Sequence, residues 1–554
     1  MSSVLTWEAL RGAELDWLLV VTLRGQPYRF SLVDQSVTDG ADTLHFVGGL
    51  SPIEVQDSVP LPGGGVTDRS ATIEVMWTGD TATGWATLAA GDHDIGDGHA
   101  ELSLWKVGTE FSARQVVMSG GLDSLEYGAL HEPVKFTIVV SPWETTGKVL
   151  PGAGQQVTAS TFPPAGVSLG STIGEGLEDE YYPIVIGKPG TGPAGQLYAG
   201  SPGLLVSIPA TGDNTGTAGY VLIAGHETQA GYAGTAVSID NRTAVGGTWP
   251  STLNASHIKD QLGRTVTVCT WIAPPTIQDG AELWVSWNGP DGGLPSMRRA
   301  GTMRGAGEVL SYLMGLTGLE VDTEGLRSVE SELDGFLLDF HINDQVESWD
   351  LIQDQVIPLL PVTWWVGPRG LSVRRWPYDA TMADAVAHLD ADRGADRVSV
   401  VRRSSASQVV NQLGISFAQN AETDDTIGRL VYAPTTQANL ADQEVNPYSV
   451  ASARRHGTRE ADDIAAEFVT DASTARAVLD WRIRWESTTH EMVTYAGPLP
   501  WVALNPCDVV TVTDTELGWA SKLFIVTGVL RTPGPTTELA LVSVPDFIRD
   551  SPVT

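Results

Sequence analysis

The sequence predicts a mainly β protein of several domains with some α+β parts. Three observations lead to this prediction. The chain has 554 residues, and ~3–5 domains of ordinary size would account for such a length. Its 60 glycines and 32 prolines favour many turns, and therefore many short strands. Hydrophobic residues make up 42% and charged residues 18% of the chain, as is typical of domains with packed cores.

The first 145 residues show strand patterns throughout. Runs such as LDWLLVVTLRG (15–25) and VKFTIVVSP (134–142) are rich in β-branched and aromatic residues, with turn residues between the runs. Residues 1–145 are therefore predicted to form a domain that closes its own core as a β-barrel or a β-sandwich. Residues 146–182 are rich in Gly, Ser, Thr and Pro, and are predicted to be a linker or an extended arm.

Residues 183–300 return to short strands, as in RTVTVCTWIA and ELWVSWNG, and predict a β-sandwich-like middle domain. Residues 301–380 predict a small α+β domain. Its first helix places Val309, Leu313 and Leu316 on one face. A second helix is expected after Asn343 as N-cap, with an apolar stripe of Val346, Trp349, Ile352 and Val356. The run 362–376 predicts a hairpin that turns at GPRG.

Residues 381–554 predict a second β-barrel with one packed helix. The run TDASTARAVLDWRIRWES is expected to be that helix, capped by Thr470 or Asp471. Its buried stripe would be Ala475, Val478, Leu479 and Ile483. The turn in LNPCDVVTVTD (504–514) feeds a strand, and two further strands follow at 522–530 and 537–545.

The formal net charge is −34. Such an acidic surface repels phosphates, so we expect no specific binding of nucleic acid, although DNA could slide past it without sticking. Cys269 and Cys507 lie far apart in the sequence and lack metal-ligand spacing. The sequence leaves open whether the two thiols are free or form a disulfide. The N-terminus lacks the features of a signal peptide, and LLVVTL (18–23) is too short to span a bilayer. We expect a protein made in a cytoplasm, with no membrane span.

Two segments contain groups that resemble reactive sites. GVSLG (166–170) matches G-x-S-x-G around Ser168, but loop sequence lies on both sides, where the motif needs a strand and a helix. Three consecutive acids in the linker could act as an acid–base pair, although such runs are usually solvated; they are Glu178, Asp179 and Glu180. We interpret both segments as structural.

Two further groups could bind a ligand. A polar turn could hold an ion through Asp92, His93, Asp94, Asp97 and His99, but its spacing does not fit an EF-hand loop. Four tryptophans of the middle domain could form a sugar-stacking platform, although core packing is the interpretation we prefer; they are Trp249, Trp271, Trp284 and Trp287. The strong motifs for nucleotide, zinc and thiol chemistry are absent from the sequence. We therefore predict no catalytic, cofactor-binding or metal-binding residues, and no enzyme.

Three motifs follow one another in the C-terminal part of the chain. The first is S-x-x-R-x-G, the second is D-x-x-T-A in the predicted helix, and the third is L-x-P-x-D-x-V. They are carried by Ser452, Arg455 and Gly457, by Asp471, Thr474 and Ala475, and by Leu504, Pro506, Asp508 and Val510. In this order the motifs resemble the closing module of tailed-phage baseplate hub, or tail-tip, proteins. Cys507 stands where that family usually has glycine, which puts a left-handed backbone there in question.

Two other regions share this resemblance. The segment 305–376 has a helix, an L-D-G-x-x-x-D-F-x-I-N pattern from Leu333 to Asn343 and a G-L-x-V-R strand at Gly370–Arg374. The first 145 residues look like the first barrel of such hubs. The middle domain is the part that the resemblance covers least.

The resemblance implies a structural virion protein without enzymatic activity. In the family, a homotrimer closes the distal end of the tail tube, and each subunit supplies two tube-like β-barrels. The implied partners are a distal tail or tail tube protein, the C-terminus of the tape-measure protein, and a tip or receptor-binding protein. The implied location is the tail baseplate or tip of the virion, after assembly in the host cytoplasm, with a role in DNA ejection.

Two other functions stay open at this point. One is a tail-borne carbohydrate-binding or adsorption protein that acts through the aromatic residues of the middle β domain. The other is an enzyme, such as a cell-wall hydrolase, that would use Ser168, Glu178 or Glu180.

Overall fold

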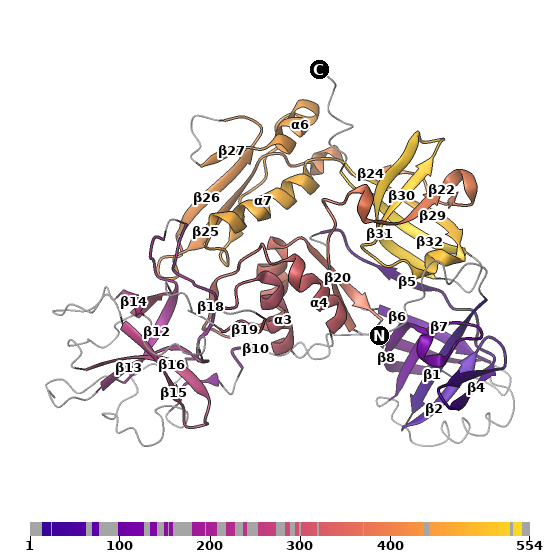
Figure 1. Ribbon diagram of the computed structural model, residues 1–554, viewed down its shortest axis with the longest axis horizontal. Coiled ribbons are helices and arrows are strands. Elements are labelled where there is room, and N and C mark those ends of the chain that lie inside the picture. The colour runs from indigo at the N-terminus through magenta and orange to yellow at the C-terminus, as the bar shows by residue number, and fades with distance from the viewer. Residues whose placement is uncertain are drawn as a thin grey trace.

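The protein is mainly β and has several domains, as the sequence predicts (Figure 1). The computed structural model describes residues 14–23, 25–62, 69–76, 98–126, 133–140, 149–152, 155–158, 180–193, 195–207, 218–227, 236–240, 253–272, 283–287, 294–298, 301–317, 321–368, 370–436, 442–531 and 536–545. Within these residues, no helix is long and apolar enough to cross a membrane.

The N-terminal domain is built on one eight-stranded sheet with the order β3-β4-β2-β1-β7-β8-β9-β6. Along β1, inward side chains such as Trp17, Leu19 and Val21 are fully buried, because alternate residues of a strand face the same side. The strands are β1 (Leu15–Leu23), β2 (Gln26–Ser31), β3 (Gln35–Asp39), β4 (Asp42–Gly48), β6 (Arg69–Val75), β7 (His99–Lys106), β8 (Gln115–Glu126) and β9 (Val134–Val140). Among the described residues, the two end strands of this order are not paired with each other.

The middle domain is a closed six-stranded barrel with the order β12-β13-β16-β15-β14-β17. The sequence predicts a sandwich here, but β17 pairs with both β12 and β14, and this joins the two edges that a sandwich leaves open. The strands are β12 (Ser201–Ser207), β13 (Ala218–Ala224), β14 (Ala236–Asp240), β15 (Leu253–Lys259), β16 (Thr265–Ile272) and β17 (Leu283–Ser286).

The α+β domain lies in the centre of the molecule (Figure 1). Its predicted first helix and hairpin are present as α3 (Ala306–Thr317) and as β20 (Val362–Gly367) with β21 (Gly370–Arg375). The domain also contains α4 (Thr323–Glu332), and β18 (Phe340–Ile342) pairs with β11 (Ile184–Ile186).

The predicted helix after Asn343 begins later than expected. Val346 lies in β19 (Val346–Glu347), which pairs with β10 (Val149–Leu150), so tertiary pairing overrides the helical pattern. The helix starts with α5 (Ser348–Asp350) and continues as the π-helical turn η5 (Leu351–Val356) and the 3₁₀ turn η6 (Ile357–Leu359). Ile352 and Val356 are buried, as the stripe predicts.

Residues 381–554 contain two sheets rather than one barrel. A four-stranded sheet has the order β27-β26-β25-β28, with β25 (Leu413–Gln419), β26 (Thr426–Ala433), β27 (Gln443–Val445) and β28 (Ile464–Ala466). The helices near it are α6 (Pro447–His456) and α7 (Ala472–Glu486). Asp471 caps α7 by accepting hydrogen bonds from Ser473 N and Thr474 N at 3.0 and 2.9 Å, and all four residues of the predicted stripe are fully buried.

The last sheet has the order β22-β30-β31-β32-β29-β23, with β24 paired to β29. Its strands are β22 (Ala385–Asp390), β23 (Asp396–Arg397), β24 (Arg402–Arg403), β29 (Glu491–Pro498), β30 (Val509–Asp514), β31 (Trp519–Arg531) and β32 (Thr536–Ser543). Short 3₁₀ turns elsewhere span Phe111–Ala113, Met382–Asp384, Ala391–Arg393, Ala406–Gln408 and Leu499–Ala503. The three strands expected after residue 504 are thus β30, β31 and β32.

Helix α7 packs on β25 and β26 rather than on the last sheet (Figure 1). Its apolar stripe meets Leu413, Ile415 and Phe417, which form an equally apolar face. The last turn of α7 reaches the C-terminal sheet, where Trp485 packs with Ile525 of β31 and Val542 of β32.

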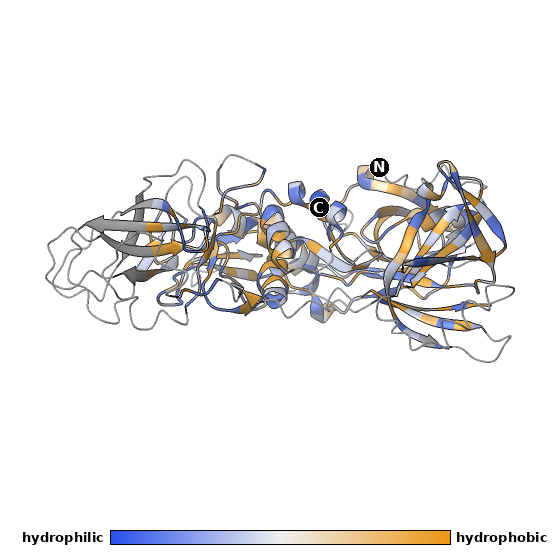
Figure 2. Ribbon diagram, turned by 90° about the horizontal axis from the view of Figure 1, so that it is seen from below, coloured by the Kyte–Doolittle hydropathy of each residue, from blue (hydrophilic) through white to orange (hydrophobic). Residues whose placement is uncertain are grey.

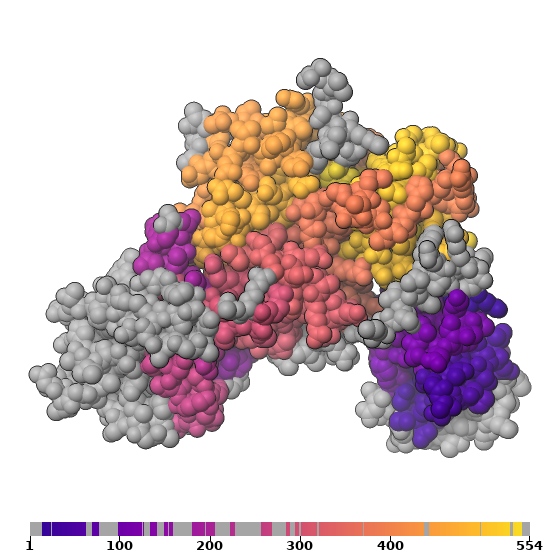
Figure 3. All heavy atoms as spheres, in the orientation of Figure 1, coloured from indigo at the N-terminus to yellow at the C-terminus, as the bar shows by residue number. Residues whose placement is uncertain are grey.

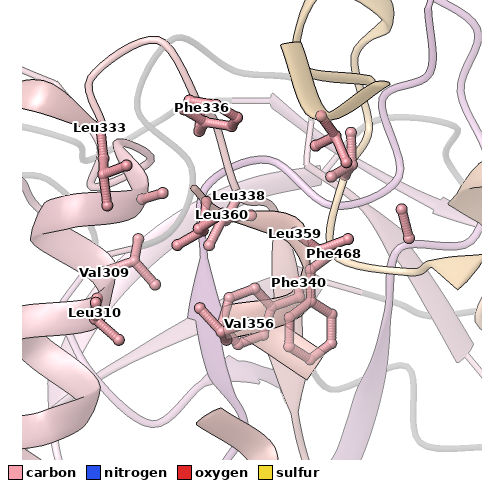
Figure 4. Close-up of a cluster of buried hydrophobic side chains, with 14 of the residues drawn as sticks. Val309, Leu310, Leu333, Phe336, Leu338, Phe340, Val356, Leu359, Leu360 and Phe468 are labelled. Atoms are coloured by element: carbon pink, nitrogen blue, oxygen red, sulfur yellow. The ribbon is translucent and has the colours of Figure 1, made fainter. Parts of the chain in front are cut away.

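The largest core joins the α+β domain to the four-stranded sheet. Figure 4 shows its centre, where Val309 and Leu310 of α3 lie near Leu338 and Leu360, with Phe340 beside Phe468. Full burial of each such side chain contributes roughly 1.5–3 kcal/mol. Figure 2 shows hydrophobic residues recurring along the coloured strands and helices, where they alternate with hydrophilic ones.

Candidate functional site

The first candidate site is the junction between the two eight-stranded sheets. Strand β5 (Val55–Ser58) belongs to the N-terminal part of the chain, yet it pairs antiparallel with β31 of the C-terminal sheet, from Val55↔Arg531 to Ser58↔Gly528. Val59 N continues the pairing by donating to Thr527 O at 2.8 Å. β30 pairs with β31 only as far as Ile525, so β5 covers an edge of β31 that β30 leaves open.

A buried ion cluster lies at the same place. The carboxylate of Asp57 contacts both Arg531 and Arg69, and these side chains are only 5%, 2% and 8% exposed. Arg531 also donates from Nε to Val502 O at 3.2 Å and from Nη2 to Leu504 O at 3.0 Å. Burial lowers the pKa of both arginines to about 10, because a low-dielectric surrounding disfavours the charged form. One carboxylate thus faces two guanidinium groups, so Asp57 provides counter-charge for both buried arginines.

The β20–β21 hairpin reinforces this junction. Thr363 Oγ1 donates to Pro60 O at 3.1 Å, and Pro368 O in the hairpin loop accepts from Ser119 N of β8 at 2.8 Å. Val366 and Val502 are buried in the core of the N-terminal domain. Figure 3 shows the N-terminal domain, in indigo, below the C-terminal sheet, in yellow, on the same side of the molecule.

The turn at residues 504–508 adopts the conformation that its motif requires. Cys507 has φ +71°, so the left-handed backbone is present although the residue is not glycine. Cys507 N donates to Val526 O at 2.8 Å, and Asp508 Oδ1 accepts from Arg374 Nη1 at 3.1 Å. The side chain of Cys507 packs among Trp365, Trp376 and Ile525. This burial offsets the roughly 1–2 kcal/mol that a left-handed L-residue costs.

The thiol of Cys507 is expected to be inert in the folded protein. It is buried and free, and burial raises its pKa to about 12, so the reactive thiolate is scarce at neutral pH. In a Cys269→Ser variant, a thiol reagent should label Cys507 only when the protein unfolds. The measurement is the rate of labelling at increasing urea concentration. Labelling in the absence of urea at the rate of an exposed thiol would contradict this expectation.

The second candidate site is a cavity of about 340 Å³ between the middle barrel, β18 and the four-stranded sheet. A buried carboxylate fixes its wall. Asp339 Oδ1 accepts from Arg304 Nε at 2.6 Å and from Lys188 N at 2.8 Å. Its Oδ2 accepts from Arg304 Nη2 at 2.6 Å and from the hydroxyl of Thr470. The side chain of Asp339 thus bonds to three other segments of the chain at the cavity wall.

Two glycines permit this close packing. Gly187 has φ +68°, and a Cβ at this position would collide with the carboxylate of Asp339. Gly200 lies against the backbone of Pro189, where there is again no room for a Cβ. The β11–β12 connection can therefore approach β18, which brings the middle barrel to the cavity.

Two histidines beside this region are neutral at pH 7. Val185 N donates to His226 Nε2 at 3.0 Å, which requires an unprotonated nitrogen. His341 lines the cavity and is bonded to the backbone of Gly200 and to the side chain of Asn343. Burial lowers the pKa of both rings from 6.5 to about 4.

Acidification should therefore destabilise the protein through these rings. Below pH 6.5 the unfolded chain binds protons that the folded rings refuse until about pH 4, so stability is lost as the pH falls through this window. The loss should be up to roughly 3 kcal/mol per histidine. Denaturant unfolding at pH 7 and at pH 4.5 measures this loss, and a His226→Gln variant should lose less stability between the two pH values than the unchanged protein does. An equal loss in the variant and in the unchanged protein would contradict this assignment.

The structure places few of the other predicted residues together. Ser168, Glu178, Asp179, Trp249 and the acidic turn residues Asp92, His93, Asp94 and Asp97 lie outside the described residues. Glu180 is half-buried, and its carbonyl accepts from Val157 N at 2.8 Å. His99 lies on β7 and is bonded to Ser119 Oγ at 2.9 Å. Among the described residues, no group of three His, Cys, Asp or Glu side chains could hold a metal ion.

The tryptophans of the middle domain have separate environments. Trp287 is buried and donates from Nε1 to Ser201 Oγ at 2.8 Å, which is the core role preferred from the sequence. Trp271 lies on β16. Trp284 is half-buried on β17 and lines the cavity. The sequence drew attention to Trp284, but gave no sign that its neighbours there would come from β18 and the four-stranded sheet.

No family model matches the sequence, and no curated protein matches it. Among solved structures, the chain is similar to the 43 kDa tail protein of prophage MuSo2 from Shewanella oneidensis, at 10% identity over 96% of this chain and 99% of that chain, with a TM-score of 0.37. It is also similar to a tail protein from Neisseria meningitidis MC58, at 10% identity over 95% and 96%, with a TM-score of 0.34. A chain of a native gene transfer agent virion is 12% identical over 70% and 89%, with a TM-score of 0.39.

Proposed function

We propose that this chain is a structural protein of a phage tail, and that it acts as the baseplate hub. In this role a homotrimer closes the distal end of the tail tube and connects it to tip or receptor-binding proteins. The proposal starts from the sequence motifs at Ser452–Gly457, Asp471–Ala475 and Leu504–Val510, which resemble the closing module of such hubs. It assigns no enzymatic activity.

The observation that carries the proposal is that β5, from the N-terminal part of the chain, is a strand of the C-terminal sheet. A subunit that supplies two β modules to one ring must hold them at a fixed relative position, or the ring does not close. Pairing of β5 with β31 and the buried Asp57 cluster provide this fixed position within one chain. These contacts connect the two sheets within one chain, and three copies of the chain could arrange six such modules around a channel.

The charge of the chain is consistent with this role. At −34, the protein repels phosphates, which would let DNA pass through a central channel without specific contacts. Acidic residues should therefore line the channel of the trimer. A neutral or basic channel in a structure of the assembly would contradict this part of the proposal.

The test combines the mass of the purified chain with its location in virions. Light scattering should give three times the monomer mass of 58.9 kDa, and negative-stain images should show a threefold ring with a central channel. Antibody labelling of virions should mark the distal end of the tail. A chain that remains a monomer in solution and is found away from the tail tip would overturn the proposal.

A further inference from the structure

We propose that the buried cluster of Asp57, Arg69 and Arg531 binds one small monovalent anion, such as chloride, as a second counter-charge. The inference does not depend on the hub assignment, because it rests on the charge balance and the hydrogen bonds of these three side chains. They come from β5, β6 and β31, so the anion lies where the N-terminal and C-terminal sheets meet (Figure 1).

The cluster contains more positive than negative charge. Two guanidinium groups face one carboxylate, which leaves one positive charge in excess. Among the described residues, no second carboxylate forms an ion pair with Arg69 or Arg531. Burial lowers the pKa of both arginines only to about 10, so both stay charged at pH 7. Because the three side chains are at most 8% exposed, water does little to stabilise the excess charge.

The unpaired donors of the cluster belong to Arg69. Arg531 contacts Asp57 through Nη1 and donates from its other two nitrogens to Val502 O and Leu504 O. Arg69 contacts Asp57 through Nη2, but its Nε and Nη1 atoms are buried without a hydrogen-bond partner among the described residues. Buried donors in folded proteins are nearly always satisfied, because an unmade bond leaves the group desolvated without compensation. A ligand beside Arg69 must therefore accept hydrogen bonds.

Charge and burial together select the class of ligand. A water molecule accepts hydrogen bonds but has no charge to balance the cluster. A divalent anion such as sulfate would leave one negative charge in excess, which is again an unpaired buried charge. Acids elsewhere in the chain, which give it a charge of −34, act on the cluster only at long range and cannot accept hydrogen bonds from Arg69. A monovalent anion of one or a few atoms meets both requirements, and its small size suits a cluster that is almost closed to solvent.

An anion at this place should stabilise the junction between the two sheets. Only the folded chain brings Arg69 and Arg531 together, because they are on strands of different sheets. A ligand that binds the folded but not the unfolded chain shifts the equilibrium toward the folded state. Above the dissociation constant, each tenfold increase in chloride concentration should lower the equilibrium constant for unfolding of the junction about tenfold.

Urea unfolding of the full chain tests the proposal, with chloride replaced stepwise by gluconate at constant ionic strength. Gluconate is also monovalent, but it is too large for a buried cluster. Chloride should move the transition to a higher urea concentration. Arg69→Met removes both the excess charge and the unpaired donors, and it should abolish this dependence on chloride. General effects of the two salts on the protein surface act on both proteins alike, so they cancel in the comparison.

The matched control is Arg476→Met, which removes an exposed arginine paired with Glu444 and leaves the cluster intact. This variant should respond to chloride as the unchanged chain does. The NMR line width of chloride measures binding to the unchanged chain directly, and added bromide should narrow the line by competition. The proposal is overturned if chloride and gluconate give the same transition, if Arg69→Met responds to chloride like the unchanged chain, or if the chain causes no saturable broadening of the chloride line.

Discussion

Replacing Asp57 with alanine is expected to lower the free energy of unfolding by about 3–5 kcal/mol. The change leaves Arg69 and Arg531 buried next to each other without a counter-charge, and both are more than nine-tenths buried. It also weakens the attachment of β5 to β31, since Asp57 lies in the middle of that pairing. Denaturant unfolding of the full chain measures the loss, and limited proteolysis shows whether the two sheets separate.

Two further variants show that the buried charge is the cause. Glu444→Gln breaks an exposed pair with Arg476 and should cost less than about 1 kcal/mol. A triple variant, Asp57→Ala with Arg69→Met and Arg531→Met, removes the whole cluster and should be more stable than Asp57→Ala alone. If Asp57→Ala unfolds like the exposed control, the cluster does not hold the two sheets together, and this structural support for the hub proposal is lost.

Replacing Asp339 with alanine is expected to cost a similar amount, about 3–5 kcal/mol. The carboxylate accepts both bonds of the Arg304 fork at 2.6 Å, and it also satisfies Lys188 N and Thr470. Its removal leaves these donors unpaired where the middle barrel meets the rest of the chain. Thermal and denaturant unfolding should show the loss, and a separate early transition of the middle barrel is expected.

The matched control is Asp334→Ala. Asp334 also faces an arginine, Arg298, at 3.3 Å, but the two side chains are 26% and 30% exposed. Its loss should cost less than about 1 kcal/mol, because water replaces the lost partner. If both variants lose the same free energy of unfolding, Asp339 stabilises this junction no more than an exposed ion pair does.

The sequence predicted the local elements well wherever pattern and capping agree. Helix α7 begins after Asp471 and buries the four predicted residues, because its N-cap and its apolar stripe specify the same helix. The β20–β21 hairpin and the three last strands also follow from alternation and turn residues. The start of the helix after Asn343 was wrong, because pairing of β19 with β10 comes from a segment nearly 200 residues away.

By itself, the sequence determined the mainly β fold, the acidic character and the local turns, since these depend on residues that are neighbours in the chain. Only the tertiary structure decided that β5 joins β31, that Asp57 faces two arginines, and that Trp284 shares a cavity with Phe340 and Glu467. These contacts link residues that are far apart in the sequence. Periodicity records which face of a strand is apolar, but it contains nothing about which distant segment will cover that face.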